Sequence, residues 1–141
     1  MSAAADASGN RVPAPRLAWA LAAMLATIAL GLASRRWPQA LPSAFGKYPG
    51  DALWALMVLF GCRALRPRAP THRVALAALA IDAGVELAKL WQAPWLVQFR
   101  HTTVGHLLLG QVFSWQNLAA YGAGILAGIA FDRLLLRLTA A

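Results

Sequence analysis

Four blocks of apolar residues, each near the length that crosses a membrane, constrain the fold of this chain most. They cover about residues 17–34, 50–66, 73–91 and 117–137. A helix rises about 1.5 Å per residue and the bilayer core is about 30 Å thick, so such blocks can span it. Composition agrees, because 60% of the residues are hydrophobic and 13% are charged. We predict an all-α fold: a polytopic membrane helical bundle of four transmembrane helices, forming one domain (16–138) after a flexible tail (1–15).

Two segments leave alternatives open. The first block follows Arg11 and Arg16 as the core of a signal peptide would, but it is long and ends in Arg35 and Arg36, so we expect an uncleaved span. A short segment at about 101–113 contains ten apolar-rich residues from 104 to 113, too few to span as a helix. Three interpretations of this short segment stay open: an interfacial helix, a re-entrant segment or the lead-in to the last span.

The distribution of basic residues predicts the orientation. The formal charge of +8 is scattered over the ends of the apolar blocks, which is typical of topology signals and not of a nucleic-acid partner. With the termini inside, eight basic residues lie on the cytoplasmic side and four outside. The inner set is Arg11, Arg16, Arg63, Arg66, Arg68, Arg73, Arg133 and Arg137, and the outer set is Arg35, Arg36, Lys47 and Arg100. We therefore expect a multi-pass protein of the bacterial inner membrane with cytoplasmic N- and C-termini. Arg63 is expected to extend toward the headgroups.

The third block carries three charged residues on one stripe. Asp82, Glu86 and Lys89 fall within a sector of about 60° on a helix. A charge near the bilayer centre costs about 2.5–3.5 kcal/mol, so the stripe is expected to face protein or water. Glu86 and Lys89 can pair at i, i+3, and Asp82 would compete with Glu86 for Lys89. A ligand site and a purely structural ion-pair network both fit this stripe.

The topology brings further polar residues to the outer end of the stripe, while the cytoplasmic half looks nearly all apolar. Arg100 is predicted either to anchor the interface or to pair with Glu86 or an anion. Asp51 and Asn117 are also candidates for the N-caps of the second and the last helix. The candidate ligand-binding residues are Asp51, Trp54, Glu86, Lys89, Trp91, Trp95, Arg100, His106 and Asn117.

No motif of a known catalytic centre is present in the sequence. His101 and His106 are five residues apart, unlike a helical metal pair, and Cys62 is the single cysteine. There is no Gly-rich phosphate loop and no GxSxG. We expect no metal, no cofactor and no assigned catalytic residue.

An ordered set of residues resembles a known family. The set is Gly50–Ala55 (GDALWA), Glu86, Leu90–Trp95 (LWQAPW), Arg100, Gly105–Gly110 (GHLLLG), Phe113 and Tyr121. It resembles the small bacterial membrane proteins called domain of unknown function 2809, also labelled YjgA-like, over about residues 17–132, and more remotely the VanZ-like proteins. The family pattern has Gln where this chain has Lys89, and Asp where it has Gln116 and Asn117. The resemblance implies no known reaction.

The function expected from these patterns is binding of an amphiphile or an envelope lipid headgroup at a periplasm-facing polar site. One alternative is an enzyme acting on a lipid-linked substrate, with Glu86 as general base. Another is an assembly or transport subunit with a structural ion-pair seam. Gly124 and Gly128 have GxxxG spacing, which we interpret as helix packing, with an oligomer contact as the alternative.

Overall fold

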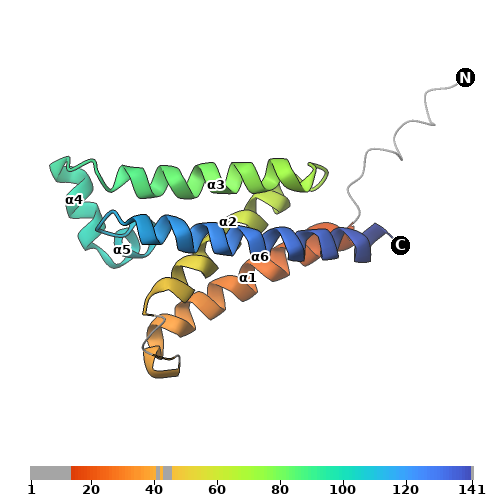
Figure 1. Ribbon diagram of the computed structural model, residues 1–141, viewed down its shortest axis with the longest axis horizontal. Coiled ribbons are helices and arrows are strands. Elements are labelled where there is room, and N and C mark those ends of the chain that lie inside the picture. The colour runs from red at the N-terminus through yellow and green to blue at the C-terminus, as the bar shows by residue number, and fades with distance from the viewer. Residues whose placement is uncertain (1–13, 41, 43–45, 141) are drawn as a thin grey trace, which may run out of the picture.

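The computed structural model describes residues 14–40, 42 and 46–140, and this part of the chain is helical without a β-strand (Figure 1). The elements are α1 (Ala14–Arg36), the short 3-10 helix η1 (Pro38–Ala40), α2 (Tyr48–Leu65), α3 (Thr71–Ala88), α4 (Pro94–His101), α5 (Thr103–Leu109) and α6 (Trp115–Ala140). The all-α prediction is confirmed. The predicted flexible tail falls almost entirely outside the described residues.

Four long helices coincide with the four apolar blocks, and their ends differ from the prediction for local reasons. α2 begins at Tyr48, because Pro49 is accommodated in a first helical turn. α3 ends at Ala88 instead of near residue 91. There the amides of Lys89, Leu90 and Trp91 each bond the carbonyl three residues back, which tightens the chain before Pro94.

Helix α2 lies at the centre of the arrangement and packs against α1, α3 and α6. Figure 1 shows α3 and α6 running side by side in opposite directions, with α1 crossing obliquely below them. The start of α1, the α2–α3 turn and the end of α6 lie at one end of the molecule, here called the terminal end. The α1–α2 connection, α4 and α5 lie at the opposite end, here called the loop end.

The GxxxG glycines let α6 approach α2 closely. A Cβ at Gly124 would lie 2.3 Å from the carbonyl oxygen of Ala52, and one at Gly128 would lie 2.7 Å from a methyl of Leu59. Both distances are too short for any larger residue. The packing interpretation is therefore confirmed, and this face is occupied within the chain.

Helices α4 and α5 form a bent pair where a loop and a short segment were predicted. The turn between them is tight, because a Cβ at Gly105 would lie 1.8 Å from the carbonyl oxygen of Phe99. The Thr102 hydroxyl caps α5 by accepting a bond from the Gly105 amide at 3.0 Å. Neither helix is long enough to span, and both cover the loop end of the bundle.

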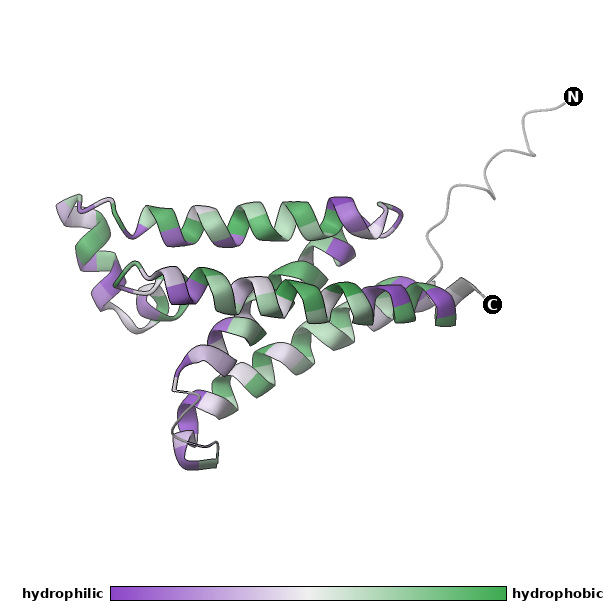
Figure 2. Cartoon of the chain, in the orientation of Figure 1, coloured by the Kyte–Doolittle hydropathy of each residue, from purple (hydrophilic) through white to green (hydrophobic). Residues whose placement is uncertain are grey.

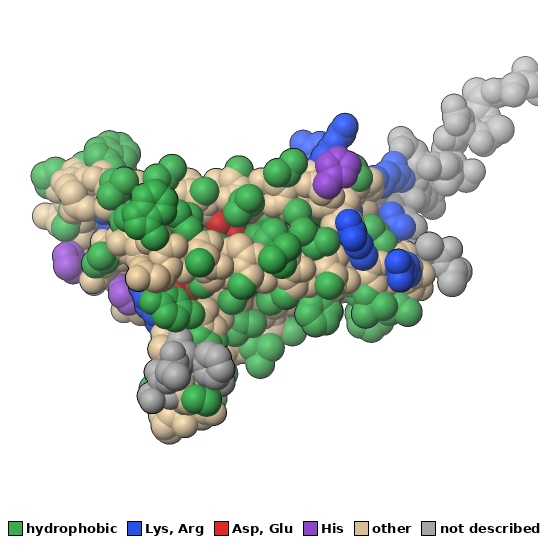
Figure 3. All heavy atoms as spheres, in the orientation of Figure 1, with side chains coloured by type: hydrophobic (Ala, Val, Ile, Leu, Met, Phe, Trp, Pro, Cys, Tyr) green, Lys and Arg blue, Asp and Glu red, His purple; other side chains and the backbone are tan. Residues whose placement is uncertain are grey.

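The interior combines an apolar cluster around Leu59 and Phe60 with many charged and polar side chains, while large apolar side chains are exposed on the outside. The largest described side chains with almost no exposure are Arg63, Leu59, Glu86, Asn117, Asp82 and Asp132. Large apolar residues on α1, α3 and α6 are instead exposed, and Figures 2 and 3 show them along the lengths of these helices. Buried charges together with many exposed large apolar side chains are unusual for a soluble domain.

Two described helical stretches, Pro15–Arg36 and Trp115–Thr139, are long and apolar enough to cross a membrane. α2 and α3 have 18 residues each and carry interior charges, so length and composition alone do not identify them as spans. The prediction of four spans stays a prediction.

Candidate functional site

The carboxylate of Glu86 organises the polar interior near the loop end. One oxygen, Oε1, accepts hydrogen bonds from the Ser114 amide at 2.7 Å and from the Asn117 side-chain amide at 3.1 Å. The other, Oε2, accepts from the Lys89 ammonium at 2.6 Å and from the Tyr121 hydroxyl at 3.0 Å. Glu86 has no exposed surface. Four donors thus saturate one buried carboxylate and join α3 to the start of α6.

Lys89 connects this network to an open cavity. Its predicted ion pair with Glu86 is confirmed, and its ammonium is nearly buried. The stem of Lys89 packs against Gly110, where an added Cβ would lie 2.9 Å from Cε. Gly110 also has a φ of 66°, which favours glycine on its own account. The Glu86 carboxylate at the ammonium and Gly110 along the stem therefore fix the position of the Lys89 side chain.

Asp82 does not compete with Glu86 for Lys89, so that prediction is wrong. Asp82 has no exposed surface, and neither of its carboxylate oxygens has a hydrogen-bond partner among the described residues. The indole N–H of Trp54 adjoins it and is equally unpartnered. The two groups are neighbours without a hydrogen bond of normal geometry between them.

Arg100 does not pair with Glu86, so that part of the prediction is wrong. Its side chain is buried, and its guanidinium donates to the carbonyls of Ala88 and, at 2.9 Å, of Trp91. These carbonyls lie at the end of α3 and in the turn that follows it, where Ala88 also accepts from the Trp91 amide. Arg100 therefore caps α3 and fastens α4 to it, and it does not contact Glu86.

A cavity of about 510 Å³ lies at the loop end, between the α1–α2 connection, the end of α3 and the α5–α6 connection. Three basic residues line it, Arg35, Lys47 and Lys89, against one acidic residue, Asp51. Lys89 is paired with Glu86, while Arg35 and Lys47 have no ion pair among the described residues. The cavity therefore presents a net positive lining, which suits an anionic group.

An apolar groove continues from this cavity. It has a volume of about 100 Å³, lies between α1, α2 and α5, and shares Arg35 and Gly50 with the cavity. Its walls include Leu32, Trp54 and Leu108. The cationic Arg35 thus stands where a polar compartment meets an apolar one.

The structure distributes the remaining candidate residues over different positions. Asp51 lies inside the first turn of α2, and Asn117 lies inside α6 bonded to Glu86, so neither is an N-cap. His106 lines the cavity. Trp91 and Trp95 are exposed and stack edge to face on each other at 5.5 Å, away from the residues that line the cavity.

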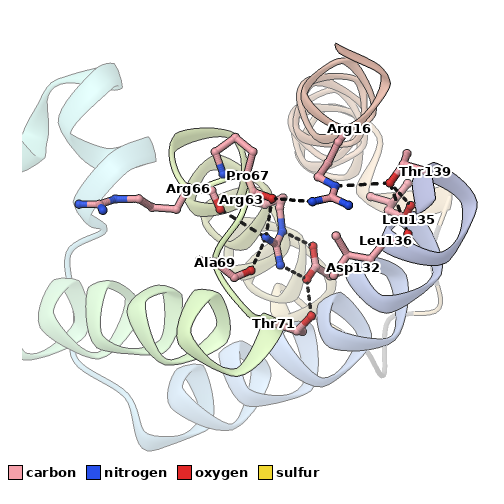
Figure 4. Close-up of polar contacts among 10 residues, drawn as sticks. All are labelled: Arg16, Arg63, Arg66, Pro67, Ala69, Thr71, Asp132, Leu135, Leu136 and Thr139. Atoms are coloured by element: carbon pink, nitrogen blue, oxygen red, sulfur yellow. Dashed lines mark hydrogen bonds and ion pairs between the residues drawn. The ribbon is translucent and has the colours of Figure 1, made fainter. Parts of the chain in front are cut away.

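A second buried polar cluster lies at the terminal end, where the sequence looked almost entirely apolar (Figure 4). Arg63 donates to both oxygens of Asp132, at 2.7 and 2.6 Å, and Thr71 donates to the same carboxylate at 2.8 Å. The Arg63 guanidinium also bonds the carbonyls of the α2–α3 turn, the shortest at 2.6 Å to Ala69. The expectation that Arg63 extends to the headgroups is wrong, because a partner on α6 lies at the same depth.

No group of three or more His, Cys, Asp and Glu side chains suited to a metal occurs in the described part of the chain. Sequence reasoning missed Asp132 and the polar role of Tyr121. The sequence contained a signal for Asp132, because an acidic residue and Arg63 lie at the same end of the fourth and second predicted spans.

Comparison with known proteins confirms the family. The family described as Protein of unknown function (DUF2809) matches residues 40–125, and the chain belongs to it. This match is shorter than the expected one but contains Glu86 and all four of its donors. No solved structure matches the chain.

Proposed function

We propose that this is an integral protein of the bacterial inner membrane with four spans, α1, α2, α3 and α6. Apolar residues on the outside and charged residues inside favour a lipid environment around the bundle. The 18 residues of α2 and of α3 extend about 27 Å as helices, close to the thickness of a bilayer core. Figure 3 shows Lys and Arg side chains gathered at the terminal end, which supports cytoplasmic termini.

Within that membrane protein, the proposed activity is binding of an amphiphile that has an anionic headgroup. This proposal is based mainly on one observation: the positively lined cavity and the apolar groove adjoin each other at Arg35. A headgroup in the cavity would bond Arg35 and Lys47, while its chain lies between α1 and α2. In the proposed orientation, the cavity opens toward the periplasm.

The groups assigned to the ligand differ from those that the sequence favoured. Arg35 and Lys47 replace Arg100 as the anion-binding cations, since Arg100 is engaged in capping α3. Trp54 keeps a role as a wall of the groove. Glu86 acts behind the site, where it holds Lys89 at the cavity wall.

An enzyme with Glu86 as general base gains less support. A general base needs a free lone pair within reach of a substrate proton. All four lone-pair positions of Glu86 are taken by donors, and the side chain is fully buried. Both interior ion pairs have their two partners within this chain, Arg63–Asp132 between α2 and α6 and Glu86–Lys89 at the end of α3, so neither supplies a free seam for an assembly partner.

Native mass spectrometry of the purified protein with defined lipids tests the binding proposal. Phosphatidic acid is expected to bind more tightly than phosphatidylcholine, because its exposed phosphate can approach both cations. Loss of a charged hydrogen bond costs about 1.5–3 kcal/mol, so Arg35→Gln should weaken phosphatidic acid binding by about tenfold or more. Arg36→Gln is the matched control, because Arg36 lies next in the chain but does not line the cavity. Equal affinity of the two variants would contradict the proposal.

The orientation has its own test. Cys62 is the only cysteine, so a Cys62→Ser protein can carry single new cysteines. Val112→Cys is expected to react with a membrane-impermeant thiol reagent in intact spheroplasts, and Arg137→Cys only after lysis. The opposite pattern would reverse the topology.

A further inference from the structure

Asp82 is a buried ionisable residue that the proposed headgroup site does not use. Asp82 lies on α3 one helical turn from Glu86, has no exposed surface, and accepts no hydrogen bond from the described residues. Asp82 therefore differs from Glu86, which has four donors, and from Asp132, which has a bidentate arginine.

The titratable side chains that face Asp82 offer it no positive charge. They are Cys62 on α2, Tyr121 on α6 and Glu86 on its own helix. Lys89, the nearest cation along α3, is bonded to Glu86. An ionised carboxylate without a counter-charge is strongly disfavoured in such a setting, whereas the neutral acid is tolerated.

A proton is the ligand that best suits this position. No cluster of three or more metal-ligating side chains exists in the described residues, and Asp82 has no second acidic ligand bonded to it. The adjoining Trp54 indole is a hydrogen-bond donor, so it would repel a cation but could serve a carboxyl C=O. A proton needs no ligand besides the carboxylate itself, so it suits this position better than a metal ion.

Water can come close to this position from the headgroup cavity. A small cavity of about 40 Å³ is lined by Asp51, Trp54, Lys89 and Tyr121, and it shares Arg35, Asp51 and Lys89 with the larger one. About 10–15 Å³ of such space is enough to hold one water molecule. The small cavity thus leads from the polar site to Trp54, the neighbour of Asp82.

We propose that Asp82 is a proton-binding site inside the bundle, reached from the loop end through the cavity that ends at Trp54 and Tyr121. A proton from water adds to one carboxylate oxygen of Asp82, and its release returns the carboxylate without any other bond change. The released state places an unpaired anion one turn from Glu86, which makes release of the proton costly. The inference does not depend on headgroup binding.

Infrared spectroscopy of the full-length protein tests this proposal directly. The protein is labelled with aspartate carrying carbon-13 in its side-chain carboxyl and placed in phosphatidylcholine nanodiscs. The carbonyl stretch of a protonated, labelled carboxylic acid is expected at about pH 7. It should lose intensity as the pH is raised, and it should be absent from Asp82→Asn.

Asp51→Asn is the matched control, and it should retain the band. Absence of a protonated aspartate band from the wild-type protein at neutral pH would overturn the proposal without any variant. Survival of the band in folded Asp82→Asn would overturn it as well. Because the nanodiscs contain only zwitterionic lipid, neither outcome bears on binding of an anionic headgroup.

Discussion

Replacement of Glu86 by Gln tests whether one carboxylate holds α3 and the start of α6 together at the loop end. Gln keeps the size of the side chain but exchanges an acceptor oxygen for an NH₂ donor. Four donors converge on Glu86, so the NH₂ group of the substituted side chain would meet at least one N–H or O–H head-on. The Lys89 ammonium also loses its counter-charge while remaining nearly buried.

The expected cost follows from these two losses. Breaking a buried ion pair by removing one partner typically costs about 3–5 kcal/mol. Lys89 lines the cavity, so its ammonium can turn toward water and recover part of that free energy. We therefore expect Glu86→Gln to lower the free energy of unfolding by about 3 kcal/mol, at the lower end of the range.

The assay is unfolding by sodium dodecyl sulfate in mixed micelles, followed by circular dichroism, for Glu86→Gln, Lys89→Gln and the double variant. Because Glu86→Gln/Lys89→Gln removes both charges, its cost should fall short of the sum of the single costs by about 1.5 kcal/mol or more. Asp51→Asn, which removes a carboxylate without an ion pair among the described residues, should change stability by less than about 1 kcal/mol.

A Glu86→Gln cost below about 1 kcal/mol would refute this reasoning, since the carboxylate would not be a structural centre. Additive single costs, within about 0.5 kcal/mol, would show that Glu86 and Lys89 do not depend on each other.

Three further predictions concern stability in the same assay. Arg63→Met and Asp132→Asn should each cost about 3–5 kcal/mol, because each leaves a buried charge unpaired; costs near zero would mean that the pair is solvated. Gly124→Ala should cost about 1–3 kcal/mol, since its Cβ would meet an α2 carbonyl, whereas Gly122→Ala, with open space around it, should be neutral or stabilising by up to about 1 kcal/mol. The reverse order would rule out the α2–α6 contact. Arg100→Lys should cost about 1–3 kcal/mol, because one ammonium poorly replaces a guanidinium that bonds two carbonyls; an unchanged stability would argue against the cap.

Local sequence patterns predicted the helices and the pairing within one helix. Apolar block lengths located the four long helices, and the i, i+3 spacing of Glu86 and Lys89 predicted an ion pair that the structure contains. Both depend on residues close in sequence, where helical geometry fixes the distance.

Contacts between distant segments were predicted poorly. Arg63 and Asp132 are 69 residues apart and pair only because α2 and α6 place them at the same depth. Arg100 faces the end of α3 because the turn at Lys89–Trp91, between α3 and α4, brings α4 back toward it. The cavity is made of several separated segments, so no single stretch of sequence could reveal that Arg35 and Lys47 share it.

An experimental structure of the protein in nanodiscs containing phosphatidic acid tests the central claim most directly. The account predicts elongated density with its phosphate between Arg35 and Lys47 and its chain in the groove between α1 and α2, with the Glu86–Lys89 pair intact behind it. A cavity that contains only water, with lipid density confined to the outer surface of the bundle, would contradict it.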